Sequence, residues 1–373
     1  MTKILILIGT NPIPCYISAL YLLDYYHSEI ELFLVCSQED PKINQAGTYI
    51  AGERIGEKIC VLFPDLKITL KEISDVASKP AIDRALQGCY HESDEVHLNY
   101  TGGTKSMAAI AFNILKDHPS FSSSYLDGRR HIMIMDGVPD NSIDLRGLEI
   151  LKLDLKSIIK LHGLDQFEKK PLKNSYSVLM EQLRMLMDKK RILDICCTKN
   201  PKKYSKEKLD EEAEQVRICR EQLIEKSGIR DHETDEEHIN KFIDGPWLEH
   251  YLYDELKKTE HDGVDIYPDV EKNNFCQVDL IAIYGYQMTL ISVTTDTHLG
   301  MSKLKAFEAI HRAHQLGGDE AKTIMVTFMR DPATLENTIR GSFGSLVPGF
   351  KAFGINHFYD GSIFTEIINY IKE

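Results

Sequence analysis

The feature that most constrains the fold is an unbroken apolar run near the amino terminus, ILILI at residues 4–8, which the sequence GTNP ends at residues 9–12. A continuous run of aliphatic and β-branched residues is typical of a strand buried on both faces of a parallel sheet. Residues 17–26 then have the pattern of an amphipathic helix, and residues 31–36 form a second buried run. This opening predicts a strand–helix–strand unit.

The same alternation continues along the first 155 residues. Further strands are expected at residues 67–70, 95–98 and 131–135, and helices at residues 48–59, 81–89 and 106–115. Strands that alternate with helices at this spacing indicate an α/β fold, a doubly wound sheet with right-handed crossovers.

The second half of the chain has a different organisation. Residues 156–240 read as a helical linker module, and residues 241–373 carry an α-β-β-β-α-β order with strands at 263–270, 278–283, 289–293 and 323–328. We therefore expect a first domain at residues 1–155, the linker, and a separate α/β domain at residues 241–373.

Charge and composition narrow the function classes. The formal net charge of −13 over 373 residues argues against a general affinity for nucleic acid, because binding to its backbone depends on Lys and Arg. The eight cysteines include no CxxC pair, which disfavours a zinc site or a disulfide framework. The amino-terminal apolar run is too short for a signal peptide and no segment is long enough to span a bilayer, so we expect a soluble, cytoplasmic protein.

Small polar residues follow the ends of three predicted strands. The candidate ligand-binding residues are Thr10, Asn11, Ser37, Gln38, Asn99, Thr101, Gly102, Gly103, Thr104 and Lys105. The carboxyl ends of the strands are where doubly wound sheets bind ligands.

The last of these segments, NYTGGTKSM at residues 99–107, joins a predicted strand to a predicted helix. Adjacent glycines let backbone N–H groups approach an anion, the helix start adds partial positive charge, and Lys105 adds a full one. The spacing is not that of a Walker A loop, and no GxGxxG motif is present. A tight turn with an N-cap threonine remains the alternative.

The order GTNP, CS, NYTGGTKSMA over about residues 1–155 resembles the CARF domain, the Rossmann-like sensor of type III CRISPR ancillary proteins. The resemblance implies a homodimer whose paired sheets form one pocket for a cyclic oligoadenylate, most often the tetra-adenylate cA4. The ten polar-end residues named above would line that pocket.

The segments GPWLE at 245–249, QVD at 277–279 and QLGGDEAK at 315–322 resemble the PD-(D/E)XK, restriction-endonuclease-like fold, which occurs fused to CARF domains. The resemblance implies that Glu249 and Asp279 hold Mg²⁺ or Mn²⁺. Ser292 and Thr294 stand where the family has the Glu and Lys of its E-x-K motif, which places hydrolysis by the usual mechanism in question.

Two substitutes for the missing pair lie nearby in the sequence. By strand alternation, Asp296 would share a face with Ser292 and Thr294 and could be a displaced metal ligand. Lys303 or Lys305, on the next predicted helix, could take the lysine role. An exposed, charged helix face is the alternative for both lysines.

The leading hypothesis is a homodimeric, cyclic-oligoadenylate-activated, metal-dependent endonuclease that cleaves RNA or DNA in antiviral defence. Its catalytic residues would be Glu249, Asp279, Asp296, Lys303 and Lys305. Three alternatives stay open. The first is a non-catalytic sensor whose nuclease-derived fold binds nucleic acid or protein, and the second is a ring nuclease that degrades the activator. The third, more distant, is a metabolic enzyme that binds mononucleotides or dinucleotides.

Overall fold

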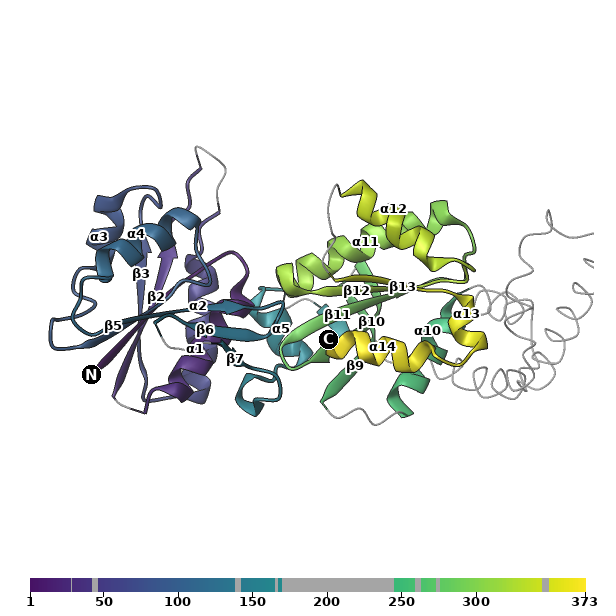
Figure 1. The fold of residues 1–373 in the computed structure, drawn as a ribbon, viewed down its shortest axis with the longest axis horizontal. Helices are drawn as coiled ribbons and strands as arrows, with labels where there is room; N and C mark the ends of the chain where they lie inside the picture. The colour runs from purple at the N-terminus through teal and green to yellow at the C-terminus, as the bar shows by residue number, and fades with distance from the viewer. Residues whose placement is uncertain are drawn as a thin grey trace, which may run out of the picture. The chain divides into compact units, whose positions relative to one another are not determined.

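The computed structural model describes residues 1–27, 29–41, 46–137, 142–164, 167–169, 245–258, 263–272, 276–343 and 349–373. The chain divides into two compact units (Figure 1). The first comprises Met1–Asp165 with Leu316–Glu320, and the second Gln166–Gln315 with Ala321–Glu373. Both units are α/β, which confirms the predicted fold class. Residues 170–244, which hold most of the expected linker, lie outside the described residues.

The first unit is built on a seven-stranded sheet with the order β3-β2-β1-β4-β5-β6-β7. Its strands are β1 (Thr2–Leu7), β2 (Ile30–Ser37), β3 (Lys67–Ile73), β4 (Glu95–Asn99), β5 (Phe121–Asp127), β6 (Ile132–Met135) and β7 (Ser142–Asp144). Its helices are α1 (Pro12–Tyr25), α2 (Tyr49–Leu62), α3 (Lys79–Leu86), α4 (Lys105–Leu115), the 3₁₀ turn η1 (Glu149–Leu151) and α5 (Leu155–Leu161).

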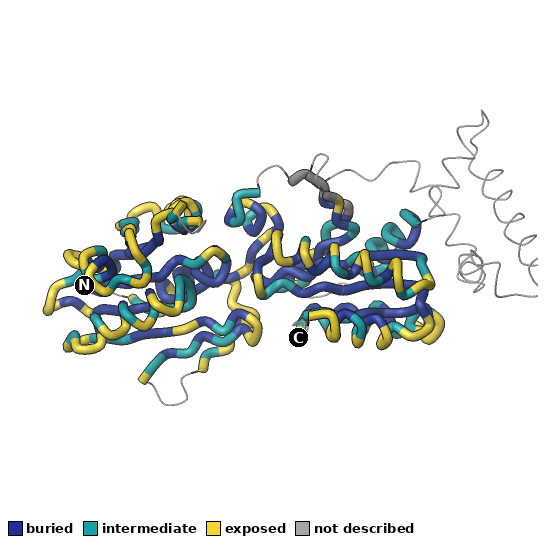
Figure 2. Tube along the Cα trace, turned by 90° about the horizontal axis from the view of Figure 1, so that it is seen from above, coloured by how far each residue is buried: buried dark blue, intermediate teal, exposed yellow. Residues whose placement is uncertain are grey.

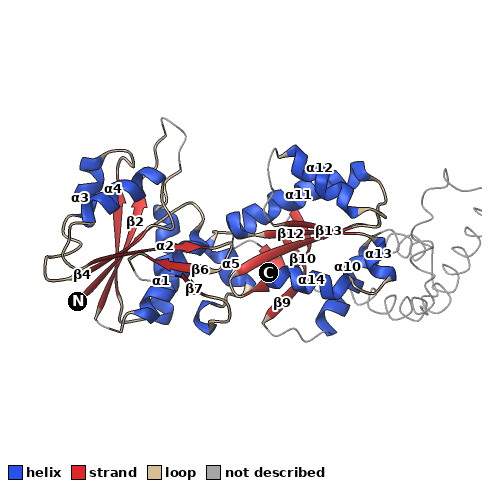
Figure 3. Ribbon diagram, viewed as in Figure 1, coloured by secondary structure: helices blue, strands red, loops and turns tan. Residues whose placement is uncertain are grey.

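The apolar run that opens the sequence forms β1, and every residue of that strand is buried. Strands β1 to β5 pair in parallel. Helices cover both faces of this sheet, α3 and α4 on one and α1 and α2 on the other (Figure 3). Because β1 is enclosed by helices on both sides, its side chains from Ile4 to Leu7 are apolar without alternation.

The sequence prediction did not include β5, nor the short strands β7, β8 (Phe167–Lys169) and β13 (Phe350–Phe353). β5, with the sequence FSSSYLD, occupies residues between the expected helix at 106–115 and the expected strand at 131–135. Its serines interrupt the apolar pattern that would have indicated a buried strand. Ser123 and Ser124 are nevertheless buried, because both hydroxyls are hydrogen-bonded inside the unit. The expected strand at 131–135 corresponds to β6, which pairs antiparallel with β5 rather than continuing the parallel order.

The second unit has a six-stranded sheet with the order β13-β12-β11-β10-β9-β8. Its strands are β8 (Phe167–Lys169), β9 (Val264–Lys272), β10 (Cys276–Tyr284), β11 (Gln287–Val293), β12 (Lys322–Val326) and β13 (Phe350–Phe353). Its helices are α10 (Pro246–Lys258), α11 (Leu299–Gly317), the 3₁₀ turn η3 (Gly318–Glu320), α12 (Pro332–Ser342), α13 (Ile355–Tyr359) and α14 (Ile363–Lys372). Of these, the end of α11 and the turn η3 lie in the segment Leu316–Glu320, which belongs to the first unit.

The expected three-stranded meander is present, since β9, β10 and β11 pair antiparallel in sequence. One face of the sheet packs on α10 and α14 around the fully buried Trp247, and the other packs on α11 and α12. Figure 2 shows buried strands inside each unit and exposed residues on the outer helix surfaces. No helix in the described part of the chain is long and apolar enough to cross a membrane.

Candidate functional site

The first candidate site lies at the topological switch point of the first sheet. β1 is the strand from which the order runs outward to β2 and β3 on one side and to β4 and β5 on the other. The loops that follow β1 and β4 therefore diverge to opposite faces, and a crevice forms between them at the carboxyl ends of the strands.

Three glycines bring these two loops into contact. A Cβ atom placed on Gly102 would lie 2.3 Å from the Leu7 carbonyl oxygen and 2.6 Å from the Gly9 backbone nitrogen. A Cβ atom on Gly9 would lie 3.2 Å from the Gly103 nitrogen. Gly103 also has φ of +75°, in the left-handed region that favours glycine. The adjacent glycines of the TGGT loop thus allow close backbone packing.

Capping residues fix the helices that begin at the two loops. The Asn11 side-chain oxygen accepts a hydrogen bond of 3.2 Å from the Ile13 N–H at the start of α1. The Thr104 hydroxyl accepts one of the same length from the Met107 N–H at the start of α4. The N-cap threonine that the sequence left as an alternative to an anion-binding loop is therefore present.

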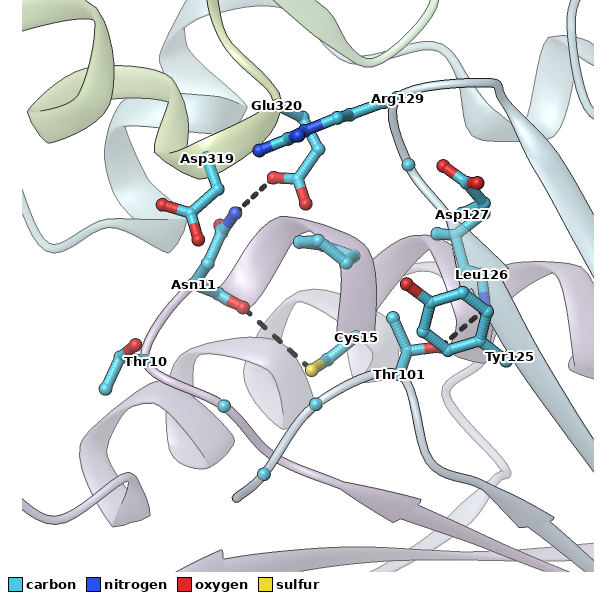
Figure 4. Close-up of a pocket in the computed structure, with 15 residues that line it drawn as sticks. Thr10, Asn11, Cys15, Thr101, Tyr125, Leu126, Asp127, Arg129, Asp319 and Glu320 are labelled. Carbon is cyan, nitrogen blue, oxygen red and sulfur yellow. Dashed lines mark hydrogen bonds between the residues drawn. The ribbon is translucent and has the colours of Figure 1, made fainter. Parts of the chain in front are cut away.

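A pocket of about 490 Å³ opens beside these loops (Figure 4). This volume falls in the range of small-molecule sites. Its walls come from the loop after β1, the loop after β4, the end of β5 with the turn that follows, and the segment Leu316–Glu320 of the same unit. The lining residues are Gly9, Thr10, Asn11, Pro14, Cys15, Thr101, Gly102, Gly103, Tyr125, Leu126, Asp127, Gly128, Arg129, Asp319 and Glu320.

The charged side chains that line the pocket are Asp127, Arg129, Asp319 and Glu320. Asp127 forms an ion pair of 2.6 Å with Arg130, and the Asn11 amide donates a hydrogen bond to Glu320. Burial raises the pKa of Glu320. Arg129 is exposed and lines the pocket, so it brings a guanidinium group to this wall.

Cys15 is fully buried under the glycine loops, with its thiol 3.5 Å from the Leu7 carbonyl oxygen. Burial raises the pKa of this thiol to about 11. A thiol that holds its proton at neutral pH is a poor nucleophile, so the group acts in packing.

The structure divides the ten sequence-predicted ligand residues into two groups. Thr10, Asn11, Thr101, Gly102 and Gly103 line the pocket. The other five are Ser37, Gln38, Asn99, Thr104 and Lys105, and none of them is among its lining residues.

The residues outside the pocket have structural surroundings of their own. Ser37 is buried and bonded to Thr48, while Gln38 donates to Glu72 on β3. Thr104 caps α4 and Lys105 is exposed at its first position. The strand-end argument placed these residues at the correct edge of the sheet, but it could not tell which of them face the crevice.

Asn99 is fully buried and holds the TGGT loop by hydrogen bonds. Its side-chain oxygen accepts a hydrogen bond of 3.3 Å from the Thr101 N–H, and its amide donates to Ser124 at 2.9 Å. The Ser124 hydroxyl lies 2.8 Å from His97 Nε2. Burial lowers the pKa of His97 to about 3, so the imidazole is neutral. A satisfied buried network of this kind fixes the position of the loop.

Sequence reasoning missed Tyr125, Asp127 and Arg129, because it missed β5. The signal was available in the segment YLDGRR at residues 125–130, where Asp-Gly marks a turn between two strands.

The second candidate site lies in the second unit, where β11 separates from β10. The last residue pair of their ladder is Leu280 and Ile291. Beyond it, the Asp279 carboxylate accepts hydrogen bonds from the Val293 N–H at 2.7 Å and from the Ser292 hydroxyl at 3.2 Å. The Asp279 side chain therefore takes the place of a β10 backbone acceptor for the Val293 N–H.

The two lysines proposed from the sequence differ in position. Lys305 on α11 donates from Nζ to the Val293 carbonyl oxygen at 3.3 Å, next to the Asp279 contact. Lys303 instead places its ammonium 5.5 Å from the centre of the Phe307 ring. Lys305 is thus the lysine that the fold brings to this site.

The expectation that Asp296 shares a strand face with Ser292 and Thr294 is wrong, because β11 ends at Val293. Asp296 lies in the following loop, and its carboxylate accepts the His298 N–H at 2.6 Å. Thr294 is buried and its hydroxyl accepts from the Asp296 N–H at 3.3 Å. Glu249 is half-buried in the first turn of α10.

A divalent metal ion would need several oxygen donors at one point. Within the ranges that the structure describes, no three His, Cys, Asp or Glu side chains are grouped so that they could hold a metal ion. Glu249, Asp279 and Asp296 therefore do not form a three-carboxylate centre.

No protein-family model and no curated protein matches this sequence. Solved structures do resemble it. Can2 from Sulfobacillus thermosulfidooxidans in complex with cyclic tetra-adenylate has a TM-score of 0.63 and 13% identity, over 100% of this chain and 99% of that chain. Protein VC1899 from Vibrio cholerae has a TM-score of 0.63 and 14% identity, over 99% of this chain and 97% of that one. At these identities the likeness shows the fold, and it extends over both units.

Proposed function

We propose that this protein is a cyclic-oligoadenylate sensor of type III CRISPR defence whose second unit is a nuclease. The observation that carries the proposal is the pocket at the switch point, whose floor is the contact between the loops at Gly9 and Gly102–Gly103. The fold shared with Can2, which was solved with cyclic tetra-adenylate, supports the same ligand class.

Three features of the pocket suit a phosphodiester ligand, beside the carboxylates of Asp127, Asp319 and Glu320 that also line it. Glycine loops leave backbone N–H groups accessible to phosphate oxygens, and the start of α1 adds partial positive charge. Arg129 supplies a guanidinium that can form paired hydrogen bonds with a phosphate. A cyclic oligoadenylate with two-fold symmetry would be shared by two copies of the chain, so we propose a homodimer.

Calorimetric titration with cyclic tri-, tetra- and hexa-adenylate tests the sensor. We expect saturable binding of one ring size, most simply the tetra-adenylate, at one ring per two chains. AMP and linear tetra-adenylate serve as controls and should bind more weakly. Absence of binding to every ring would refute the sensor assignment.

The nuclease proposal rests on Asp279, Ser292 and Lys305 around the Val293 peptide group. A carboxylate and an ammonium at the point where two strands separate are groups that can bind a cation and stabilise phosphate charge, respectively. The test is cleavage of labelled RNA and of supercoiled and single-stranded DNA, with and without the activator. Each is run in Mg²⁺, in Mn²⁺ and in EDTA, because carboxylates are the donors that these ions prefer.

One observation favours a non-catalytic sensor as the second candidate. Asp279 already has a structural role in accepting the Val293 N–H, and the neighbouring positions are Ser292 and Thr294 rather than a carboxylate and a cation. In this case binding of the activator would occur without cleavage of any substrate in either metal. Chromatography of the activator after incubation would separately reveal a ring nuclease, because the cyclic ligand would become linear.

A further inference from the structure

Tyr125 presents an exposed aromatic ring to the pocket of the first unit. On β5 the flanking residues Ser124 and Leu126 are buried, whereas Tyr125 is 38% exposed. Strand alternation therefore directs this ring away from the neighbours that anchor the strand. Tyr125 and Arg129 lie across the pocket from Thr10 (Figure 4).

A second tyrosine supports the ring from behind. Tyr100 follows β4 and stacks on Tyr125 with ring centres 5.9 Å apart and planes inclined by 23°. Phe112 on α4 meets Tyr100 edge to face, with centres 6.4 Å apart. One face of Tyr125 is thus occupied by protein.

Tyr100 is itself fixed at its hydroxyl. That group donates a hydrogen bond of 2.9 Å to Asp136, which also accepts one of 2.6 Å from Ser123 on β5. Burial raises the pKa of Tyr100 to about 12, so the phenol keeps the proton that it donates. The Tyr100 half of the stack is therefore fixed before any ligand arrives, which lowers the entropy cost of using it.

We propose that Tyr125 is a stacking platform for a nucleobase of the bound ligand, an adenine if the ligand is a cyclic oligoadenylate. The adjoining phosphate would lie toward Gly102–Gly103 and Arg129, which line the same pocket. This inference rests on the proposed function. The glycines and the Arg129 guanidinium account for contacts to phosphate, and Tyr125 adds a contact to the base.

The other lining side chains favour this assignment. Tyr125 is the one aromatic ring among the lining residues, whose side chains are otherwise mostly polar or absent. An exposed ring with a supported back face is suited to a flat π-system, and stacking on one base contributes about tenfold to a hundredfold in affinity. Stacking is tolerant of base identity, so it secures the base without selecting it.

The test compares three variants of the full chain. Tyr125→Ala removes the ring, Tyr125→Phe keeps it, and Tyr49→Ala removes an equally exposed tyrosine, at 37%, on α2 away from the pocket. Dissociation constants are measured by calorimetry for cyclic tri-, tetra- and hexa-adenylate. Fluorescence of a 2-aminopurine-substituted cyclic tetra-adenylate then reports stacking directly, and thermal unfolding checks that each variant is folded.

We expect Tyr125→Ala to weaken binding by about tenfold to a hundredfold and to relieve quenching of 2-aminopurine, with Tyr125→Phe and Tyr49→Ala close to the wild type. If the wild type binds a ring and folded Tyr125→Ala binds it equally well, the platform is refuted while the sensor stands. If the wild type binds no ring, the sensor and the platform are both refuted.

Discussion

The Asp279 carboxylate accepts the Val293 N–H at 2.7 Å, at the point where β11 leaves β10. A residue that satisfies a backbone group in this way has a structural role whether or not it also takes part in catalysis. Experiments on this site must therefore separate loss of charge from loss of the hydrogen bond.

Two substitutions at Asp279 make that separation. Asp279→Asn keeps an acceptor for the Val293 N–H, so we expect stability within about 1 kcal/mol of the wild type. Asp279→Ala leaves this N–H without its acceptor and should cost about 1–3 kcal/mol. If the unit is a nuclease, both variants lose activator-dependent cleavage. Urea unfolding and the cleavage assay are the measurements, and wild-type cleavage by folded Asp279→Asn would exclude a catalytic role.

The two lysines of α11 provide a matched pair. Lys305→Met removes the ammonium that contacts the Val293 carbonyl oxygen, and Lys303→Met removes the one beside Phe307. We expect cleavage to fall by about tenfold or more in Lys305→Met, because a positioned cation stabilises developing phosphate charge. Lys303→Met should cleave normally. Equal rates in both variants would contradict the assignment of Lys305.

Gly102→Ala tests the contact between the pocket loops. The new methyl group would lie 2.3 Å from the Leu7 carbonyl oxygen, and backbone atoms on a central strand have little room to move. We expect a loss of about 1–3 kcal/mol in the free energy of unfolding together with weaker ligand binding. Gly300→Ala is the control, since nothing lies within 4 Å of its added Cβ on α11. A Gly102→Ala variant as stable as the wild type would contradict this packing.

The buried His97 predicts sensitivity to acid. Its pKa is lowered to about 3 in the fold against 6.5 for the free side chain, so below pH 6.5 the unfolded chain gains a proton that the folded chain does not. This residue's contribution to stability is complete above pH 6.5 and falls as the pH drops toward 3. The stability difference between the wild type and His97→Gln, measured by urea unfolding from pH 7 to 4, should shrink with acid. A constant difference would contradict the buried neutral imidazole, and exposed His27→Gln is the control.

Lys322 predicts the same direction of pH dependence in the second unit, but in an alkaline range. Its Nζ donates to the carbonyl oxygens of Tyr370 and Ile371 at the end of α14, and burial lowers its pKa to about 8. Between pH 8 and 10.5 the unfolded chain holds a proton that the folded chain has lost, so this residue's contribution to stability rises with pH. The wild type should therefore gain stability relative to Lys322→Met from pH 7.5 to 9.5 in urea unfolding. No gain over that range would contradict the lowered pKa.

The predictability of the fold depended on how continuous each apolar pattern was. β1 and β2 are buried almost throughout and were clear from their sequences. β5 was not, because its inward-facing positions include serines whose hydroxyls are satisfied by His97, Asn99 and Asp136. Hydrogen bonds to partners far away in the sequence leave no periodic signal.

The candidate sites were also predictable only in part from the sequence. The TGGT loop and Asp279 were identified from local residue types. In the structure the loop follows the end of β4, and Asp279 lies where β11 separates from β10. Tyr125 escaped because its strand did, and the distinction between Lys303 and Lys305 depends on how α11 is rotated against β11. Which of two nearby side chains faces a site is a property of packing, and helical spacing alone leaves it open.

The contact between Gly9 and Gly102 has a consequence for how this protein can change over evolutionary time. The floor of the pocket consists of main-chain peptide groups, and the space above Gly102 is smaller than a methyl group. Substitutions that add a side chain at Gly102 are therefore disfavoured, and the floor of the pocket stays the same. The side chains around this floor, among them Tyr125 and Arg129, are the parts of the lining that substitution can change.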